Sequence, residues 1–543
     1  MAEAAGLSLS VVSVATLFSA FFDTVQRIRQ LRGSSGDVKE ATEALDVEQK
    51  RLLWIRDKYK TDQLEEAEPM LAVMLNLIVK ELNIITAVID KYESQTSSGE
   101  WTKSKVIRPI AWITKDKTEV AGRLSKLHSW VDSLCSLAAS ESERLARDYL
   151  VRAEAVSTCD DENLERLESL NTDLYADISK AARVKRLLLR SAENSTIKEG
   201  ATKPAHLVPF ESIQWLQADG QNSSLEGLWS MGKCRLSSRG KSDIPILVEW
   251  RDAFMDGRQQ STEARLDGLH DLLHAMYTAE ADSTELASRS ESKRQVDFGV
   301  LECLGWTRTS VSYDRLGLVF KLPTQHLPRP KSLNSVIEIS RQQKKQAPPL
   351  GKRFDMAFGV ASAMANIVAV GWLHRAVRSE NMLSLDGQSS RVFLIGFTYS
   401  RPDGPSQEFS NLPQQPDWER YRPMKASPRR SEDGNSSDDE DNQGDGPDSK
   451  TETSTFGTAA ADMYGLGVVL IEIGLWRTAR SLAKDANQFR TSRMKEFFEQ
   501  LSPRCGDVYC DVIRRCLDGR HWGTDKLKEN LADLLADLKS CHA

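Results

Sequence analysis

The sequence predicts a multidomain protein with two halves of different fold class. They are an all-α helical bundle over residues 1–200 and an α+β domain of two lobes over residues 211–543. Residues 5–195 contain little proline, and their apolar side chains recur at helical spacing. After residues 201–210, where we expect a linker, short apolar runs typical of strands alternate with helical stretches.

The composition is that of a globular protein. With 543 residues, of which 40% are apolar and 28% charged, the chain is long enough for two or three domains. The net charge of −6 is small for this length and does not indicate nucleic-acid binding. The eight cysteines form no C-x-x-C pair, which favours a reducing compartment, so we expect a cytoplasmic protein.

Apolar residues recur at helical spacing in four segments of the N-terminal half, namely 40–58, 64–91, 118–138 and 161–190. The pattern is densest between residues 70 and 88, so we expect that helix near the centre of the bundle. The last segment carries the basic residues Lys180, Arg183, Lys185, Arg186 and Arg190. A basic face can bind anionic lipid, but we expect a solvated face balanced by acidic residues of neighbouring turns.

Residues 4–22 carry no charged side chain. They do not resemble a signal peptide, because Glu3 rather than a basic residue precedes them. A helix that always spans a membrane needs about 20 mostly apolar residues, and here serine and threonine dilute the stretch. We therefore expect a helix that is buried in the protein and can be released to a membrane. The side chains expected to act there are Leu9, Val12, Leu17, Phe18 and Phe21.

The N-terminal sequence also carries short matches to a known family. They are Gly6-Leu7, Leu17-Phe18, Asp23, Gly36-Asp37, Leu45, Arg51-Leu52 and Trp54. In these residues the chain resembles the HeLo domain of fungal prion-inhibition and propagation proteins. The resemblance implies a restrained bundle whose first helix, once released, enters a membrane and causes the programmed cell death of heterokaryon incompatibility. The alternative is an ordinary buried helix in an interaction bundle.

Strands and helices alternate in the first lobe of the C-terminal half. Strands are expected over residues 245–251, 301–306 and 315–323. A helix is expected over residues 262–278, between the first two of them. His270 and His274 are four residues apart on this helix, a spacing that can bind zinc. No third ligand is evident, so we expect two histidines on a helix surface and no metal site.

Helical patterns dominate the second lobe. Helices are expected over residues 332–337, 354–373 and 462–473. The stretch from Ser384 to Gly387 predicts a hairpin turn, which places residues 393–397 on the strand that follows. Residues 425–455 contain many carboxylates and almost no apolar side chain, so we expect a disordered acidic insertion there.

One motif of this lobe has a specific spacing. It consists of His374, Arg375, Ala376, Arg378, Asn381, Gly396 and Phe397. It resembles the catalytic loop of protein kinases, H-R-D-x-x-x-x-N, with D-F-G about fifteen residues further on. Asp462 leads an apolar helix that resembles the kinase helix whose first Asp bonds the loop backbone. The resemblance implies a bilobal protein kinase-like fold, with Asp462 as a structural anchor beneath His374 and Arg375.

Both working carboxylates of the kinase pattern are missing. Ala376 stands at the position of the catalytic Asp, and Gly396 stands at that of the metal-binding Asp. Phosphoryl transfer needs one carboxylate to orient the substrate hydroxyl and another to hold magnesium on the phosphates. We therefore expect a pseudokinase, which is not an enzyme, with no catalytic residue and no cofactor.

The sequence leaves nucleotide binding open. A kinase holds the phosphates with a Lys on its third strand, but the strand at residues 245–251 has Glu249 and Arg251 in its place. Lys321 and Leu322 end the strand that would lead into the hinge between the lobes. The candidates for binding ATP are Arg251, Lys321, Leu322 and Asn381.

Three functions follow from these expectations. In the first, the kinase-like domain responds to a signal and regulates a bundle that acts on membranes. The second is an interaction scaffold without enzymatic activity, and the third is an atypical protein kinase that binds ATP. We expect protein partners or self-association, conditional membrane contact through the N-terminal helix, and no nucleic-acid partner.

Overall fold

A computed structural model gives the fold of the chain. The residues that it describes are 14–30, 36–62, 68–93, 117–157, 160–170, 174–194, 205–216, 229–235, 243–252, 259–277, 296–309, 315–322, 330–385, 391–403, 417–423, 458–491, 493–522 and 526–542. The expectations for Leu9, for Val12 and for the acidic insertion at residues 425–455 lie outside the described residues.

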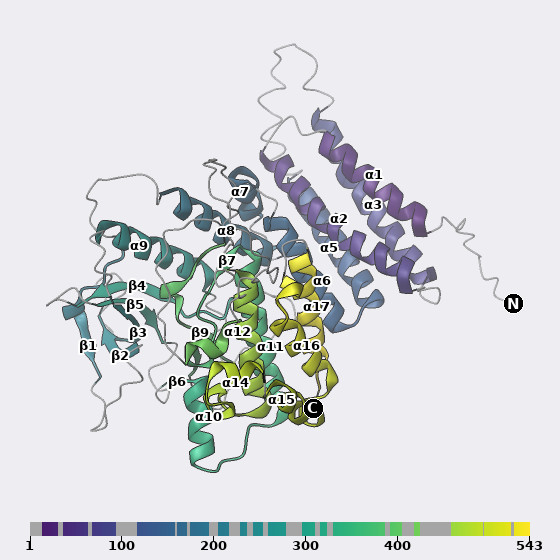
Figure 1. The fold of residues 1–543 in the computed structure, drawn as a ribbon. Coiled ribbons are helices and arrows are strands. Elements are labelled where there is room, and N and C mark those ends of the chain that lie inside the picture. The colour runs from purple at the N-terminus through teal and green to yellow at the C-terminus, as the bar shows by residue number, and fades with distance from the viewer. Residues whose placement is uncertain are drawn as a thin grey trace, which may run out of the picture. The chain divides into compact units, whose positions relative to one another are not determined.

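Long helices form the N-terminal bundle (Figure 1). They are α1 (Val14–Gln30), α2 (Gly36–Asp62), α3 (Glu68–Glu93) and α5 (Lys117–Ala138). Both α1 and α5 pack on α2 and α3. One face of α3 carries the fully buried side chains Leu75, Ile78, Leu82 and Ile85. The helices expected over residues 40–58, 64–91 and 118–138 are therefore confirmed. The central place expected for residues 70–88 is not, because α3 packs on α1 and α5, whereas α2 packs on these two and on two later helices.

The prediction of a single helix over residues 161–190 is wrong, because two helices cover this range. α7 (Asp161–Ser169) ends at Leu170, whose ψ of 44° leaves the helical region, and α8 (Ala176–Asn194) follows. Between the two helices, the buried hydroxyl of Tyr175 donates a hydrogen bond to Glu48. α6 (Glu141–Ser157) precedes α7 and packs on α2 and α8.

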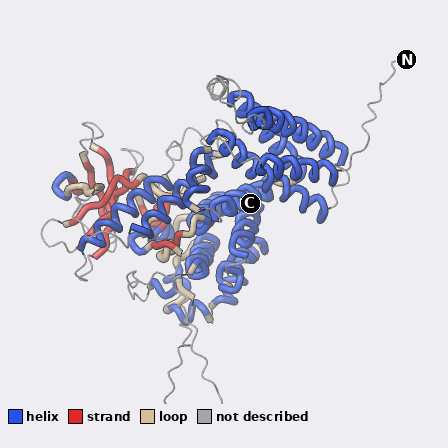
Figure 2. The backbone as a smooth tube through the Cα atoms, turned by 90° about the horizontal axis from the view of Figure 1, so that it is seen from above, coloured by secondary structure: helices blue, strands red, loops and turns tan. Residues whose placement is uncertain are grey.

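A five-stranded antiparallel sheet follows the bundle in the described residues. Its strands are β1 (Ile213–Trp215), β2 (Trp229–Cys234), β3 (Ile244–Asp252), β4 (Cys303–Arg308) and β5 (Arg315–Lys321). They lie in the order β1-β2-β3-β5-β4 and are drawn in red in Figure 2. Ile246, Val248 and Trp250 share one face of β3, where they pack with Ile213 and Val319. α9 (Gln259–Met276) follows β3 and packs on β4, so the expected strands and helix are confirmed.

The expected linker at residues 201–210 is described from residue 205 onward, and there it is part of the sheet. Leu207 pairs with Trp306 of β4 as a parallel neighbour. The Trp306 N–H donates to the His206 carbonyl at 3.0 Å, and the Val208 N–H donates to the Trp306 carbonyl at 2.8 Å. Backbone hydrogen bonds therefore hold this segment at the edge of β4, which corrects the expectation of a linker.

Helices dominate the remaining described residues. They are α10 (Leu333–Gln342), α11 (Leu350–Ala369), α12 (Ala459–Leu475), α13 (Ala479–Leu482), α14 (Ala486–Arg490), α15 (Met494–Cys505), α16 (Asp507–Leu517) and α17 (Leu527–Ser540). The short strands are β6 (Lys331–Ser332), β7 (Trp372–Leu373), β8 (Met382–Ser384), β9 (Phe393–Leu394) and β10 (Arg401–Pro402). β8 pairs with β6 and β9, and β7 pairs with β10.

The hairpin of β8 and β9 is the expected one, but the second strand is shorter than expected. β9 ends at Leu394, so Gly396 and Phe397 do not lie on a strand. Gly396 has a left-handed φ of 95°, which interrupts extended backbone, and Phe397 begins a short 3₁₀ helix over Phe397–Tyr399.

The chain divides into two compact units, and the division differs from the one expected at residues 201–210. One unit comprises residues 1–327, 361–371 and 528–542, and the other comprises residues 328–360 and 372–527. The bundle and the five-stranded sheet share the first unit because α8 packs on α9. The second half of α11 belongs to the same unit, and the Tyr149 hydroxyl of α6 donates to the Ala365 carbonyl there at 3.1 Å.

Candidate functional site

Residues 374–381 connect β7 and β8, and a buried carboxylate holds the start of this loop. The two oxygens of Asp462, in the first turn of α12, accept hydrogen bonds from the N–H of His374 and of Arg375, both at 2.7 Å. Arg375 has a left-handed φ of 64°, which stores strain in a residue other than glycine. Burial raises the pKa of Asp462 to about 7, against the opposing effect of both donors. These are the bonds expected of a structural anchor.

The imidazole of His374 is buried and bonded at both nitrogens. Nε2 donates to the carbonyl of Ile395 at 3.1 Å, and Nδ1 accepts from the N–H of Ala376 at 3.3 Å. The ring packs edge-on against Phe397, with centroids 4.8 Å apart. Burial lowers the pKa of His374 to about 4, so the ring is neutral at pH 7. His374 therefore joins the loop to the chain after β9 and is not placed for proton transfer.

Ala376 and Gly396 both adjoin Asn381. Its side-chain amide donates to the Ala376 carbonyl at 2.8 Å, and its backbone carbonyl accepts from the N–H of Ile395 at 2.9 Å. A Cβ placed on Gly396 would lie 2.4 Å from Nδ2 and 2.7 Å from Cγ of Asn381. Asn381 therefore fills the space that any side chain at position 396 would need, and the left-handed φ of Gly396 adds strain for any other residue.

Arg378 lies on the buried side of the loop. Its guanidinium is centred 3.8 Å from the ring centroid of Trp418, a cation–π contact, and its Nη2 is 3.4 Å from Oδ1 of Asn381. Arg422 lies over the same ring at 5.8 Å. Residues 417–423 therefore pack on the loop and hold Arg378 away from solvent.

A second buried carboxylate beside the loop, Glu472 of α12, was not found from the sequence. Its Oε1 accepts from the Tyr421 hydroxyl at 2.9 Å and from the Ala479 N–H at 2.6 Å. The Tyr421 hydroxyl is also 3.0 Å from Oγ of Ser379 in the loop. Burial, followed by the nearby Glu380, raises the pKa of Glu472 to about 8. A lone acid in an otherwise apolar stretch of helix was the available signal.

Glu472→Gln is expected to reduce the pH dependence of stability. The pKa of Glu472 is about 8 in the folded protein and 4.5 as a free group, so the folded protein binds this proton more tightly. The resulting stabilisation is complete below the free value and is lost as the pH rises through about 8. Between about pH 5 and pH 9, we expect the unfolding free energy of the wild type to fall by several kcal/mol relative to the variant. Parallel curves, like those expected for the exposed control Glu499→Gln, would contradict this.

Two of the nucleotide candidates are engaged within the five-stranded sheet. The Nζ of Lys321 pairs with the Glu302 carboxylate at 3.0 Å. The Lys321 N–H donates to the Glu302 carbonyl at 2.8 Å, and the Leu322 N–H donates to the Pro245 carbonyl at 2.9 Å. A hinge would use backbone groups to bind adenine, and these two N–H donors are already used.

β3, the strand of the candidate Arg251, carries a buried carboxylate. Glu249 alternates with Val248 and Trp250 along β3 and therefore lies on the other face. Glu249 is 4% exposed, whereas the side chain of Arg251 lies outside the described residues. A buried carboxylate would repel a nucleotide phosphate. The fourth candidate, Asn381, belongs to the other compact unit.

The helix expected to act on membranes is buried in the bundle. Within the described residues α1 begins at Val14, and it packs on α2 and α3. Phe18 is 3% exposed and Phe21 0%, and Phe22 contacts both rings, with centroids 6.2 and 5.7 Å away. Leu17 lies on α1, but its side chain is outside the described residues. Among the described helices, none is long and apolar enough to cross a membrane.

The basic residues of α8 are largely balanced by α7. Arg186 contacts three carboxylates of that helix, those of Asp161 (3.1 Å), Glu165 (2.9 Å) and Glu168 (3.0 Å). Lys180 points elsewhere and donates to the Val296 carbonyl at 3.1 Å, and burial lowers its pKa to about 8. These contacts favour the solvated, charge-balanced face over a lipid-binding one.

A charged network that the sequence did not predict lies inside the bundle. Oε1 of the fully buried Glu48 is 2.7 Å from Nδ1 of His128 and accepts from the Tyr175 hydroxyl at 2.9 Å. Oε2 pairs with Arg51 at 3.1 Å, and Arg51 also reaches Asp132 at 2.7 Å. Burial alone would raise the pKa of Glu48, but Arg51 and His128 lower it to about 2. The network ties α2 to α5 and to the start of α8.

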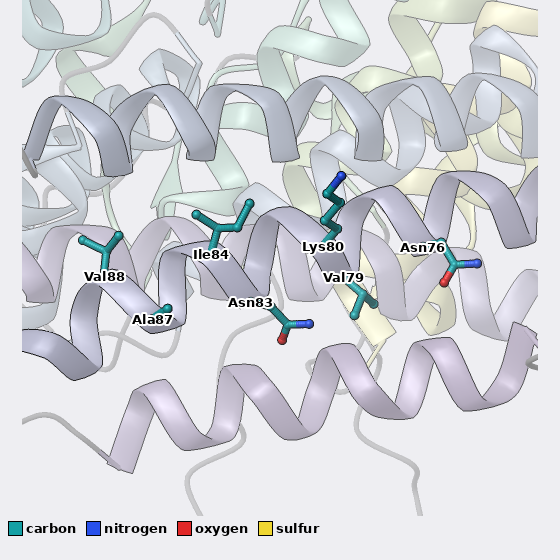
Figure 3. Close-up of a pocket in the computed structure, with 7 residues that line it drawn as sticks. All are labelled: Asn76, Val79, Lys80, Asn83, Ile84, Ala87 and Val88. Atoms are coloured by element: carbon teal, nitrogen blue, oxygen red, sulfur yellow. The ribbon is translucent and has the colours of Figure 1, made fainter.

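A shallow groove of about 600 Å³ follows α3. It is lined by Asn76, Val79, Lys80, Asn83, Ile84, Ala87 and Val88. Figure 3 shows Val79 and Asn83 on one side of the helix, and Lys80 and Ile84 on the other. The groove does not include the residues expected to act on membranes or to bind a nucleotide.

No family model matches the chain, and a search of curated proteins finds no match.

Proposed function

We propose that this protein is a signal-responsive effector in which a catalytically inactive, kinase-like domain restrains a HeLo-type helical bundle. When the restraint is lifted, α1 leaves the bundle and acts on a membrane. A protein partner or a second copy of the chain delivers the signal.

The order of elements supports the kinase-like part of this proposal. β3 is the third strand of the five-stranded sheet, and α9 follows it where a kinase has its regulatory helix. β4 and β5 come next, and α12 later supplies the Asp462 carboxylate to the loop at His374 and Arg375. This order of elements supports the resemblance to a kinase.

The packing at Gly396 is the main support for a catalytically inactive domain. A kinase needs a carboxylate at this position to hold magnesium. Here Asn381 fills the space, and its amide is bonded to the carbonyl of Ala376, the other position that lacks its acid. The packing of Asn381 therefore leaves no room for a carboxylate at position 396.

The purified chain is expected to transfer no phosphate from Mg-ATP to protein substrates. Restoring both acids, in the variant Ala376→Asp/Gly396→Asp, is also expected to give no transfer. The new side chain at position 396 would lie 2.7 Å from Cγ of Asn381 and would need a left-handed backbone. Phosphate transfer by the wild type that is lost in Asn381→Ala would refute the proposal and favour the atypical kinase.

Contacts between the bundle and the end of α11 support the proposal that the kinase-like domain restrains the bundle. The Tyr149 hydroxyl donates to the Ala365 carbonyl at 3.1 Å, and Arg152 donates to Oδ1 of Asn366 at 2.6 Å. A Cβ on Gly371, just past α11, would lie 2.7 Å from Nζ of Lys185 on α8. Residues 365–371 lead directly into the loop at His374, so a change in the loop can reach α6 and α8.

Asn366→Ala is expected to release the bundle in the full-length chain. The substitution removes the bond from Arg152 and the bond from the Asn366 amide to the Asp297 carbonyl, without changing any residue of the bundle. We expect this variant to release dye from anionic vesicles at least tenfold faster than the wild type, since about 1.4 kcal/mol of restraint corresponds to a factor of ten. Ser362→Ala on the same helix is the control.

A charge on α1 separates membrane action from folding. Ser19 is exposed in the bundle, so Ser19→Glu leaves the folded form intact, but a charge within a membrane costs about 3 kcal/mol. In the Asn366→Ala background, Ser19→Glu should abolish leakage, whereas Gln26→Glu, exposed beyond the uncharged stretch at residues 4–22, should not. If Asn366→Ala neither binds vesicles nor releases dye from them, membrane action is excluded.

The second candidate function is an interaction scaffold, and the groove on α3 favours it. Besides the groove, α3 exposes Val73 at 46% and Met70 at 52%. Exposed apolar side chains along one helix are suited to binding a protein. The vesicle experiment decides between the two functions, because a scaffold would leave vesicles intact in every variant.

A further inference from the structure

Two histidines and an aspartate meet beside α9. His270 and Asp271 are neighbours on α9, and His206 lies in the segment that pairs with β4. Oδ1 of Asp271 is 3.1 Å from Nε2 of His206 and 3.1 Å from Nδ1 of His270. The ligand atoms of these three side chains all lie within 4.8 Å of one another. They are the common ligand types of transition metals in proteins.

The backbone at His206 is fixed by the same helix. The carboxylate of Asp267, one turn before Asp271, accepts from the N–H of Ala205 at 3.0 Å and from that of His206 at 3.1 Å. It also accepts from the indole N–H of Trp306 at 2.8 Å. Asp267 therefore holds the His206 segment against both α9 and β4, so His206 is positioned before any ligand binds.

The exposure of the three side chains differs in a way that suits a metal site. His270 is 8% exposed, whereas the side chain of Asp271 is 50% exposed. The rings of His206 and His270 stack with centroids 3.8 Å apart and an angle of 23°. Water can therefore reach the cluster from the side of Asp271, and binding of one ion by both rings requires one of the stacked imidazoles to turn.

We propose that His206, His270 and Asp271 bind a divalent transition-metal ion of the zinc class, with water completing the coordination. Zinc lies about 2.0–2.2 Å from such ligands, so the ligand atoms of a tetrahedral site are roughly 3.4 Å apart. Two of the three separations here are already 3.1 Å. Two imidazoles and one carboxylate suit zinc better than calcium or magnesium, which prefer oxygen ligands.

The spacing in the sequence indicates His270 and His274 as a metal-binding pair, rather than His206 and His270. His274 is one turn after His270, but its ring centroid is 5.7 Å from that of His270, and it is not part of the cluster. His206 comes from far earlier in the chain and is brought to α9 by the edge of the sheet. The inference goes beyond the proposed function and does not depend on it.

The alternative is a hydrogen-bonded clamp in which Asp271 accepts from both imidazoles and no metal binds. Both arrangements hold the His206 segment on α9, so stability alone does not separate them. Binding of a metal ion separates them, because it requires both histidines at once.

Equilibrium dialysis of the metal-free, full-length chain against Zn²⁺ tests the proposal. We expect one saturable ion that is lost, or bound at least about tenfold more weakly, in His206→Ala and in His270→Ala. His274→Ala is the matched control on the same helix and should bind like the wild type. Asp271→Asn, which keeps the side-chain shape, should also weaken binding.

Circular dichroism shows whether each variant is folded, and hydrogen exchange gives a second readout. Zn²⁺ should slow exchange at residues 205–208 in the wild type and in His274→Ala, but not in His270→Ala. Binding that is equal in all variants would overturn the proposal, because the ion would then be held elsewhere. Absence of saturable binding below millimolar Zn²⁺ would leave the clamp as the role of the cluster.

Discussion

Glu48→Gln is expected to lower the free energy of unfolding by about 3–5 kcal/mol, the cost of leaving a buried charge without its partner. Arg51 is 5% exposed, and after the substitution its remaining ion-pair partner is Asp132, whose side chain is 55% exposed, while its Nη1 still lies 3.0 Å from Nδ1 of His128. The Tyr175 hydroxyl and His128 lose a charged acceptor at the same time. Denaturant unfolding followed by circular dichroism measures the loss.

The pH dependence of this effect has a definite sign. The pKa of Glu48 is about 2 in the folded protein and 4.5 as a free group. Its stabilisation is therefore present above the free value and is lost as the pH falls toward about 2. The difference between wild type and Glu48→Gln should shrink over that range. Asp57→Asn, which removes an exposed ion pair with Arg56 on the same helix, should cost less than about 1 kcal/mol. An equal effect of the two substitutions would contradict the role of the network.

Asp462→Ala is expected to destabilise the chain by about 2–6 kcal/mol. It leaves the N–H groups of His374 and Arg375 without their acceptor, and each buried donor without a partner costs about 1–3 kcal/mol. The left-handed backbone of Arg375 then loses the bond that holds it. Asp462→Asn keeps one acceptor oxygen, so its effect should be about half as large.

Hydrogen exchange at the amides of His374 and Arg375 measures the local consequence. Both amides should exchange much faster in Asp462→Ala, whereas amides of α16 should respond only through the change in global stability. Asp511→Asn, an exposed acid of α16, is the control and should change neither. Unchanged protection of the two amides in Asp462→Ala would show that the carboxylate does not hold the loop.

Much of the framework could be predicted because its signals are local. The alternation in residues 245–251 identifies β3, and the three-and-four spacing in residues 64–91 identifies α3. The motif spacing also placed Asp462 under His374, which is a contact between residues far apart in the chain. In that case the prediction came from a resemblance to a family rather than from periodicity.

The parts that could not be predicted depend on distant residues meeting. In the sequence Glu48 and Arg51 are ordinary charges on a helix, and only the fold brings them together with His128 of α5 and with Tyr175, the residue before α8. The contact of Tyr175 with Glu48, shortly after the break at Leu170, is likewise visible only in the fold. At Gly396 only the fold shows that Asn381 occupies the space that a side chain there would need.

α11 is one continuous helix of 20 residues, and it is shared between the two compact units, which divide at residues 360 and 361. Helices lose their order from the ends, and a new end in the middle would leave several backbone groups unbonded. Neither unit can therefore melt completely while the other stays intact, unless α11 breaks near its midpoint. We therefore expect the stabilities of the bundle and of the loop region to be linked, so that a substitution that weakens one also lowers the melting temperature of the other.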